Sequence, residues 1–420
     1  MHVLFLTHYF PPEVNAPASR TYENARRWVR DGHRVTVITC TPNHPNGVVY
    51  PGYRNRWCFQ EELDGIRVLR VKTYLSANKG FAKRIANYIS YMISATLFST
   101  LVRDVDVVVS TSPQFFCGLA GYFASRMRRA PWVVEIRDLW PESIIAVGAI
   151  RSRAVIDLLE GLETFMYSRA DHVVAVTDAF KRHIAGRGVG VEHITVIKNG
   201  ADLERFTPGP KENAFRKEYG LEGKFVVSYV GTHGMAHGLD TIFEAAEAMR
   251  DREDIVFLLV GDGAERERLL TRKEEQGLSN VLMIPQQPKE RMPEIINASD
   301  ACMVLLKKND LFKTVIPSKI FEAMAMERPI ILGVEGESRE IVEQGRCGLC
   351  IEPENAVELA EAIRRLDADE RLAGDLGQNG RCYVSTVFDR EVLARRYLET
   401  LSPLVPSQVA TMEIVEKESM

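Results

Sequence analysis

The run 317–322, Pro-Ser-Lys-Ile-Phe-Glu, combines residue types that could bind a phosphate group and a sugar. Pro317 and Ser318 are typical of a helix start, because proline fits the first turn and a serine oxygen can accept an otherwise unpaired N–H. Lys319 and Glu322 are spaced to lie on one side of that helix. A cation can neutralise phosphate, and a carboxylate can accept two hydrogen bonds from a vicinal diol such as a ribose. A surface ion pair worth about 0.3 kcal/mol is the alternative interpretation.

Two glycine-bearing loops follow predicted strands in the same half of the chain. Residues 231–238, Gly-Thr-His-Gly-Met-Ala-His-Gly, come after one strand, and residues 260–263, Val-Gly-Asp-Gly, end the next. Glycine lets backbone N–H groups approach an anion, and a helix N-terminus adds a favourable dipole. The spacing is not GxGxxG, so a dinucleotide fingerprint is absent. An ordinary strand-to-helix turn explains either loop equally well.

The first half offers two charged residues near expected strand ends. Ser19 is the expected N-cap of the first helix, so that the neighbouring Arg20 would stand at the mouth of the ligand crevice, available to a diphosphate. Asp138 follows a buried strand at 132–136, where a carboxylate could orient a substrate hydroxyl. A solvated arginine and a structural Arg137–Asp138 pair are the respective alternatives.

Two patterns that suggest metal ligands do not predict a metal site. Asp104 and Asp106 form a DxD pattern, but they precede the strand at 106–110 and so lie at the wrong end of a parallel sheet. Cys347 and Cys350 have CxxC spacing without a second pair or nearby histidines, which favours buried thiols. We therefore expect neither a metal nor a cofactor.

Strand-like runs alternate with helical patterns through both halves of the chain. This rhythm implies right-handed crossovers and a parallel sheet covered on both faces in each half. The expected strands are 2–7, 34–39, 66–71, 106–110, 132–136, 172–176, one before the Asn199-Gly200 turn, 225–230, 255–260, 281–284, 301–306, 330–333 and 349–351.

The predicted fold class is therefore α/β, with an acceptor-side Rossmann-like domain at 1–200 and a nucleotide-binding one at 201–388. When two such domains face each other across a cleft, the carboxyl ends of their strands place the ligand site between them. We expect a helix at 389–402 to pack back toward the first domain. Residues 403–420 lack periodicity and predict a disordered tail.

The composition is that of an ordinary soluble protein. The chain has 420 residues, 45% of them apolar and 26% charged, with a formal net charge of −4, so nothing indicates a nucleic-acid partner. Its seven cysteines are scattered and odd in number, which suits reduced thiols in the cytoplasm. The N-terminus has the pattern of a first strand rather than of a signal peptide.

One uncharged segment, 85–102, follows Lys79, Lys83 and Arg84. Its serine, threonine and asparagine residues argue against a helix that crosses about 30 Å of hydrocarbon. A helix packed on its own sheet and a helix lying on a membrane surface both stay open.

Taken in order, the motifs resemble those of the retaining family-4 glycosyltransferases with the GT-B fold. Within that family the chain is similar to bacterial fucosamine and related aminosugar transferases of surface-polysaccharide assembly, over roughly residues 1–400. The matching motifs are at 11–13, 137–143, 197–202, 260–263, 298–300 and 317–323.

By this resemblance the second domain binds a nucleotide-sugar. Glu322 would bind the ribose hydroxyls, while Lys319 and the main chain around Ile316 would hold the diphosphate. Main-chain groups of 284–286 would receive the base, and Asp138 would contact the donor sugar or the acceptor. The implied donor-binding residues are Arg20, Gly231, His233, His237, Gly261, Ile284, Gln286, Ile316, Pro317, Ser318, Lys319 and Glu322, and the implied catalytic residues are Asp138, Lys319 and Glu322.

Two departures from the family pattern affect this site. Thr314 occupies the position of the first glutamate in the family's glutamate pair, so recognition of the donor sugar's hydroxyls would differ. His233 and His237 stand where the family has a basic pair. Because they are neutral at pH 7, the stabilisation of a diphosphate would depend more on Lys319 and Arg20.

The implied activity is transfer, with retention, of an N-acetylated aminosugar such as FucNAc or GlcNAc from a UDP-sugar to a lipid-linked acceptor in O-antigen or exopolysaccharide assembly. Such enzymes are thought to react through a short-lived oxocarbenium-like ion pair, so the protein mainly positions substrates and stabilises charge. A basic flank at 79–84 beside an apolar face could dock the first domain on the inner face of the plasma membrane through residues 79–102.

Two other functions stay open on sequence grounds. A nucleotide-sugar 2-epimerase shares the same architecture and would also need a diphosphate site. A non-catalytic sugar-binding partner in an assembly complex is compatible with Thr314 in place of a glutamate.

Overall fold

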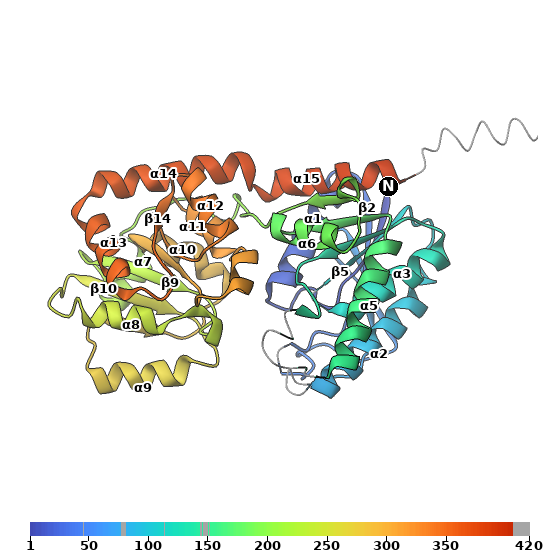
Figure 1. Ribbon diagram of the computed structural model, residues 1–420, viewed down its shortest axis with the longest axis horizontal. Coiled ribbons are helices and arrows are strands. Elements are labelled where there is room, and N and C mark those ends of the chain that lie inside the picture. Colours follow the sequence, from blue (N-terminus) through green and yellow to red (C-terminus); the bar gives the residue numbers. More distant parts are fainter. Residues whose placement is uncertain are drawn as a thin grey trace, which may run out of the picture. The chain divides into compact units, whose positions relative to one another are not determined.

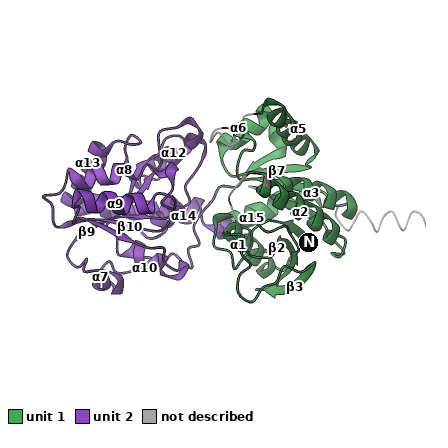
Figure 2. Cartoon of the chain, turned by 90° about the horizontal axis from the view of Figure 1, so that it is seen from below, with its two compact units in different colours: residues 1–198, 393–420 green, residues 199–392 purple. Residues whose placement is uncertain are grey.

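The computed structural model describes residues 1–44, 46–76, 81–112, 114–142, 145, 150 and 152–405, without the side chains of Phe81 and Ala82. The chain forms two compact units (Figure 1, Figure 2). Unit 1 comprises Met1–Lys198 and the segment from Leu393 onward, and unit 2 comprises Asn199–Val392. The boundary expected at residue 200 lies beside this division.

Unit 1 is built on an eight-stranded sheet in the order β3-β4-β2-β1-β5-β6-β7-β8. The strands are β1 (His2–Leu6), β2 (Arg34–Cys40), β3 (Cys58–Leu63), β4 (Ile66–Val71), β5 (Val107–Thr111), β6 (Trp132–Ile136), β7 (His172–Ala175) and β8 (Ile194–Val196). Neighbouring strands are parallel except for β3, which pairs antiparallel with β4. The sequence did not predict β3, because this edge strand is largely exposed and lacks a buried β-branched run.

Helices pack on both faces of this sheet. Leu4 and Leu6 join a core with α2, α3, α5 and α6, whereas Val3 and Phe5 join another with α1 and α15. This alternation follows from the two-residue period of a strand. The helices are α1 (Ala16–Arg30), α2 (Phe81–Ser99), α3 (Phe115–Arg128), α5 (Arg153–Arg169), α6 (Asp178–Gly186) and α15 (Arg390–Leu401), with short η1 (Val191–His193) and η5 (Ser402–Leu404).

The first helix begins earlier than the sequence predicts. Its N-cap is Asn15, whose side-chain oxygen accepts the Ala18 N–H at 2.9 Å. Ser19 therefore lies inside α1 and is not its cap. Pro17 fits the first turn, where its missing N–H costs nothing. Arg20 consequently belongs to the body of the helix.

Helix α15 completes the second face of the unit 1 sheet. Trp28 Nε1 donates to the Ala394 carbonyl oxygen at 2.9 Å, and the Trp28 and Tyr397 rings meet edge to face at 5.3 Å. Of the tail expected at 403–420, residues 403 and 404 lie in η5, and 406–420 lie outside the described residues.

Unit 2 has a six-stranded, all-parallel sheet in the order β11-β10-β9-β12-β13-β14. The strands are β9 (Phe225–Val230), β10 (Ile255–Val260), β11 (Val281–Ile284), β12 (Ala301–Leu305), β13 (Ile330–Gly333) and β14 (Gly348–Cys350). The helices are α7 (Ala214–Tyr219), α8 (Asp240–Glu247), α9 (Arg266–Gln276), α10 (Met292–Asn297), α11 (Lys319–Ala325), α12 (Glu337–Gln344), α13 (Ala356–Ala368) and α14 (Glu370–Val387), with short η2 (Met235–His237), η3 (Lys289–Arg291) and η4 (Asp310–Thr314).

The strand order reverses direction between β1 and β5 in unit 1 and between β9 and β12 in unit 2. In open parallel sheets, ligands bind outside the carboxyl ends of the strands at such switch points. The loops that follow these strands are therefore the place to look for a functional site in each unit.

Candidate functional site

The loops after β9 and β10 are packed against each other through glycine. Gly231, Gly261 and Gly263 have φ values of 144°, 153° and 156°. A Cβ on Gly261 would overlap the carbonyl oxygen of Gly231. The Gly261 N–H donates to the Ile284 carbonyl oxygen at 3.0 Å, which ties the end of β11 to the same edge. Because a side chain would not fit at Gly261 or Gly263, the two loops pack backbone against backbone at this edge.

A buried tyrosine beside these loops organises the nitrogen-bearing side chains. Lys319 Nζ lies 3.7 Å from the centre of the Tyr229 ring, and the Tyr229 hydroxyl donates to the Thr232 carbonyl oxygen at 2.8 Å. Nζ is buried and has no hydrogen-bond partner within the described part of the chain. Burial lowers the pKa of Lys319 to about 7. The amine is thus held on an aromatic face, and the charge of Glu322 favours its protonated form.

Two histidines share this tyrosine. The rings of His233 and His237 lie 6.0 and 6.1 Å from the Tyr229 ring. His233 is fully buried, and neither of its ring nitrogens has a hydrogen-bond partner among the described residues. Burial, with the positive charges nearby, lowers the pKa of both imidazoles to about 4. Both are therefore neutral at pH 7.

This group of three nitrogen-bearing side chains suits a bound anion. Removing a positive charge from water without a hydrogen-bond partner is costly, which is why burial disfavours protonation of these groups. A diphosphate would reverse this balance, because its negative charge favours the protonated form of each group. The arrangement can therefore bind a diphosphate and stabilise the charge of a leaving diphosphate.

Glu322 lies on the same helix as Lys319 and shares a cavity with it. The cavity, of about 290 Å³, is lined by Ser228, Val230, Ile296, Cys302, Met303, Val304, Lys319, Glu322 and Ala323. Burial raises the pKa of Glu322, and the charges of Lys289, Lys319 and Arg205 oppose that shift. A carboxylate surrounded by cations can accept hydrogen bonds from a diol while keeping its charge.

The start of α11 differs in one detail from the prediction. Ser318 occupies the N-cap position, but its side chain makes no capping hydrogen bond. The main chain turns through a 3-10 bond instead, from the Phe321 N–H to the Ser318 carbonyl at 3.1 Å. Ile316 is buried, while Pro317 and Ser318 are half-buried.

The segment expected to receive a base follows β11. Ile284 is the last residue of that strand and is buried, and Gln286 is exposed. Thr314, which stands in place of a glutamate, ends η4 and donates through Oγ1 to the Leu311 carbonyl at 2.7 Å. Its hydroxyl therefore stabilises a local turn.

Arg20, in unit 1, is bound to its own unit. Its side chain is 9% exposed, and Nε donates to Glu135 Oε1 at 2.9 Å. Its Nη atoms donate to the carbonyls of Lys198 and Ile197 at 3.0 and 2.8 Å. Burial alone would raise the pKa of Glu135, but the charges of Arg20 and Arg137 hold it below its usual range. This corrects the expectation that Arg20 is available to a diphosphate: its role is to neutralise a buried carboxylate.

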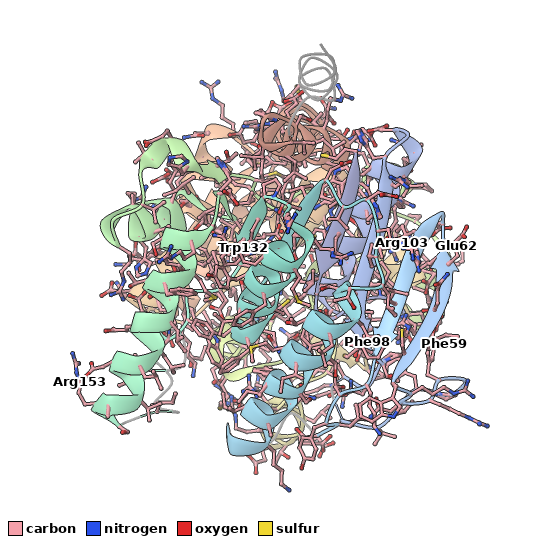
Figure 3. The ribbon with its side chains drawn as sticks, turned by 90° about the vertical axis from the view of Figure 1, so that its right-hand side faces the viewer. Phe59, Glu62, Phe98, Arg103, Trp132 and Arg153 are labelled. Atoms are coloured by element: carbon pink, nitrogen blue, oxygen red, sulfur yellow. The ribbon has the colours of Figure 1, made fainter. Side chains whose placement is uncertain are left out.

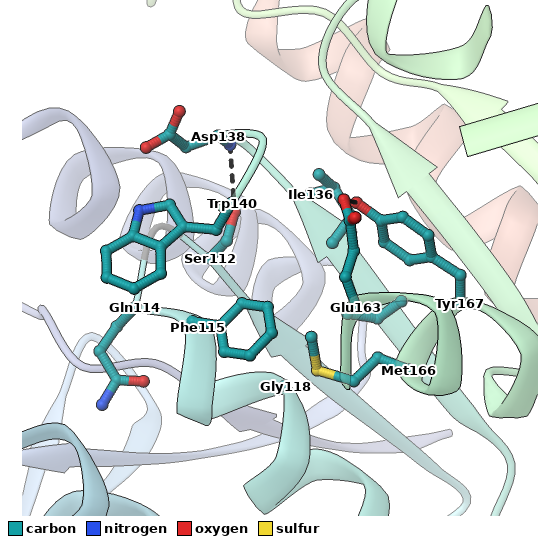
Figure 4. Close-up of a pocket in the computed structure, with 11 residues that line it drawn as sticks. Ser112, Gln114, Phe115, Gly118, Ile136, Asp138, Trp140, Glu163, Met166 and Tyr167 are labelled. Atoms are coloured by element: carbon teal, nitrogen blue, oxygen red, sulfur yellow. Dashed lines mark hydrogen bonds between the residues drawn. The ribbon is translucent and has the colours of Figure 1, made fainter. Parts of the chain in front are cut away.

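Asp138 borders a pocket at the ends of β5 and β6 (Figure 4). Its backbone N–H donates to Ser112 Oγ at 3.2 Å. The pocket, of about 330 Å³, is mostly apolar, and the Phe115 and Trp140 rings stack in its wall at 5.9 Å. Its other lining residues are Gln114, Gly118, Val134, Ile136, Glu163, Met166 and Tyr167. Asp138 is thus a polar group at the edge of an apolar pocket.

The structure brings together Gly231, Gly261, His233, His237 and Lys319 in unit 2, with Glu322 on the adjoining turn of α11. Arg20 and Asp138 belong to unit 1. Sequence reasoning missed Tyr229, which holds the group together, and Glu135, which binds Arg20. A buried tyrosine inside a strand and a buried glutamate inside another give no local signal of such a role, because their partners are distant in sequence.

Within the described ranges, no three His, Cys, Asp or Glu side chains are arranged to hold a metal ion. None of the helices there is long and apolar enough to cross a membrane.

Each half of the chain matches a glycosyltransferase family. Residues 211–382 match the family described as "Glycosyl transferases group 1", and residues 15–200 match "Glycosyl transferase 4-like domain". A full-length relative is the "Putative colanic acid biosynthesis glycosyl transferase WcaI" of Escherichia coli (strain K12). It is 24% identical over 96% of this chain and 100% of its own length.

Solved structures show the same fold over nearly the whole chain. Sucrose-phosphate synthase from Thermosynechococcus elongatus is 19% identical, with a TM-score of 0.75 over 96% of this chain and 98% of its own. Anabaena Alr3699/HepE in complex with UDP-glucose is 19% identical, with a TM-score of 0.71 over 96% of this chain and 100% of its own. The fold is therefore GT-B.

Replacing Arg20 with Gln tests whether this residue is structural. The substitution leaves Glu135 buried without its charge partner, so we expect the free energy of unfolding of unit 1 to fall by about 3 kcal/mol, with an unchanged Kd for UDP. All four tryptophans precede residue 199, so tryptophan fluorescence during urea denaturation reports on unit 1. Arg30→Gln, exposed at the end of α1, is the matched control. An Arg20→Gln protein of normal stability that binds UDP poorly would contradict this role.

Proposed function

We propose, on the premise that this chain is a glycosyltransferase with the GT-B fold, that it transfers an N-acetylated aminosugar from a UDP-sugar to a lipid-linked sugar acceptor with retention at the anomeric carbon. The observation that carries the proposal is the group formed by Lys319, His233 and His237 around Tyr229. It is a site for an anion, built on glycine loops inside a domain that matches the group 1 glycosyl transferases.

In the proposed donor site, the diphosphate contacts the glycine loops and Lys319, and Glu322 accepts hydrogen bonds from the ribose. The bond between the sugar's anomeric carbon and the diphosphate oxygen breaks, and the acceptor hydroxyl oxygen forms the new bond from the same face. The leaving diphosphate takes the acceptor's proton. Lys319 and the two imidazoles stabilise the negative charge that develops on the leaving group. Asp138 orients a hydroxyl of the acceptor or of the donor sugar.

The proposed nucleotide, sugar, acceptor and pathway rest on similarity to other proteins. UDP as the nucleotide is supported by the fold shared with a protein solved in complex with UDP-glucose. A role in surface-polysaccharide assembly, of the exopolysaccharide or O-antigen kind, is supported by the relative named for colanic acid biosynthesis. The aminosugar, FucNAc or GlcNAc, and the lipid-linked acceptor are supported by the order of sequence motifs.

Replacing Glu322 with Ala tests the donor site. Loss of a charge-assisted contact to the ribose is worth about 2 kcal/mol, so we expect the Kd for UDP to rise about 30-fold and turnover of a UDP-sugar with a prenyl-diphosphate-linked acceptor to fall at least as much. Glu340→Ala, an exposed glutamate of unit 2, is the control and should match the wild type. Intact turnover and intact UDP affinity in Glu322→Ala would overturn the site assignment.

We further propose that unit 1 docks on an anionic membrane through exposed apolar side chains of α2 and α3 and the turn after α2. The two helices lie side by side (Figure 3). We call this surface the α2–α3 face; it consists of Ile93, Leu97, Leu101, Phe123 and Met127, which are 45–59% exposed. Ile93, Leu97 and Leu101 are spaced four residues apart, as are Phe123 and Met127, which is the spacing of residues on one side of a helix. The helices adjoin at their ends, where Arg128 Nη1 donates to the Val102 carbonyl at 2.6 Å.

Charge around the α2–α3 face complements an anionic lipid surface. Arg103, Arg126 and Arg129 are exposed beside it, and residues 81–103 and 115–131 contain no Asp or Glu. Each such arginine contributes about 1 kcal/mol near an anionic bilayer. The basic flank predicted from the sequence lies at the other end of α2, and Lys79 is outside the described residues. The inner side of α2 packs on the sheet through Tyr88, Tyr91 and Ala95. The same helix can therefore pack on the sheet with one side and face a membrane with the other.

Vesicle sedimentation tests the α2–α3 face. Wild-type protein should bind vesicles that contain phosphatidylglycerol, and the triple change Ile93→Ser, Leu97→Ser and Leu101→Ser should abolish that binding with turnover on a soluble acceptor preserved. Val155→Ser with Leu158→Ser, exposed apolar positions on α5, is the control. Wild-type protein that ignores such vesicles, or a triple variant that still binds them, would refute the proposal.

A further inference from the structure

The ring of Tyr229 forms the surface on which the Lys319 side chain ends. Tyr229 lies inside β9 and is fully buried, and the centre of its ring is 3.7 Å from Lys319 Nζ. An aromatic face attracts a cation within about 6 Å of its centre, and most strongly where both groups are removed from water. The contact is therefore a cation–π interaction whenever the amine is protonated.

This kind of contact leaves the charge of the amine available to a ligand. A lysine ammonium has three N–H donors, and Nζ has no hydrogen-bond partner among the described residues. Glu322, one turn further along α11, acts on Lys319 through its charge. A carboxylate in hydrogen-bond contact would occupy donors of the ammonium group and neutralise it, whereas a ring face fixes its position and neutralises nothing.

The Tyr229 ring is itself fixed from two sides. Its hydroxyl donates to the Thr232 carbonyl oxygen at 2.8 Å, in the loop that directly follows β9. The rings of His233 and His237 lie 6.0 and 6.1 Å from it. A close-packed ring inside a central strand has little room to move. It can therefore hold the end of a long, flexible lysine side chain in one place.

Titratable groups on α11, β12 and the loop after β9 act on the same amine. The charges of Glu322 and Cys302 favour the protonated form of Lys319, but burial outweighs them and lowers its pKa to about 7. The charge of Lys319 in turn lowers the pKa of His233 and of His237. Protonation of Lys319 is thus balanced near neutral pH, where a weaker attraction by the ring has a measurable effect.

We propose that Tyr229 is a positioning residue for the donor: its ring face holds the Lys319 ammonium where the diphosphate binds, and so sets the affinity for the nucleotide. The inference rests on the proposed transferase function, in which Lys319 contacts the diphosphate. It adds a residue that acts through Lys319 and touches no substrate. Because His233 and His237 are neutral at pH 7, Lys319 is the main positive charge of this group, and its position matters accordingly.

Fluorination of the ring tests this role with little change of shape. Fluorine withdraws electron density from the ring face, so each added fluorine weakens the attraction of a cation. The Tyr229→Phe protein keeps the ring, and its Kd for UDP should stay within about threefold of the wild type. Mono-, di- and trifluorinated phenylalanine at the same position should then raise the Kd stepwise, by about tenfold with the third fluorine.

The pKa of Lys319 gives a second measurement that needs no nucleotide. It should fall by about one unit in the trifluorinated protein and in Tyr229→Met, because the ammonium loses an attraction that the neutral amine never had. Phe257→Met removes another fully buried ring of unit 2 and is the matched control for lost packing. It should leave the pKa of Lys319 and the Kd for UDP unchanged.

A second substitution shows whether Tyr229 acts through Lys319. In the Lys319→Met background, trifluorination of the ring should change the Kd for UDP by less than about twofold, because no amine remains to be held.

A Kd for UDP that ignores fluorination, or that responds equally in Lys319→Met, would overturn the positioning role, while UDP binding by the wild type leaves the transferase function standing. Wild-type protein that binds neither UDP nor any UDP-sugar would instead contradict the transferase function. The pKa of Lys319 would still report whether the ring holds the amine.

Discussion

The donor end of unit 2 depends on a buried lysine amine that has no hydrogen-bond partner among the described residues. Lys319 Nζ sits on the face of Tyr229, and the two flanking imidazoles are neutral. Glycines of the β9 and β10 loops make this arrangement possible, because a Cβ on Gly261 or Gly263 would overlap neighbouring backbone and one on Gly231 would crowd Lys319 Nζ. Burial thus disfavours the charged form of Lys319, and the negative charge of a diphosphate would favour it.

In unit 1, by contrast, a buried positive charge is paired with a buried carboxylate. Arg20 and Glu135 form a buried ion pair. The same guanidinium donates hydrogen bonds to the carbonyl oxygens of residues 197 and 198. Unit 1 also contains a mostly apolar pocket beside Asp138.

The strands and the switch-point loops follow directly from the sequence, because buried parallel strands need β-branched runs and glycine marks the close approaches. Edge strand β3 and helix α14 do not follow from such reasoning, because β3 is largely exposed and α14 contains three glycines, which lower helix propensity. Side-chain roles were harder to predict. The sequence predicted an accessible Arg20, because its partner Glu135 is distant in sequence. It did not single out His8, because ring partners of His8 come from α2. Local sequence patterns predict whether a residue lies in a strand, a helix or a loop. The burial of its side chain and its interaction partners become known only from the fold.

The most direct test of this account is an NMR titration of the Lys319 amine, assigned with Lys319→Arg, without and with saturating UDP. The account predicts a pKa of about 7 in the free protein and a rise of about two units or more when the diphosphate binds. Binding would then take up protons near neutral pH, and the affinity for UDP would weaken as the pH rises from 7 to 9. A pKa near the ordinary lysine value of about 10.4 in the free protein, or one that UDP does not change, would contradict it.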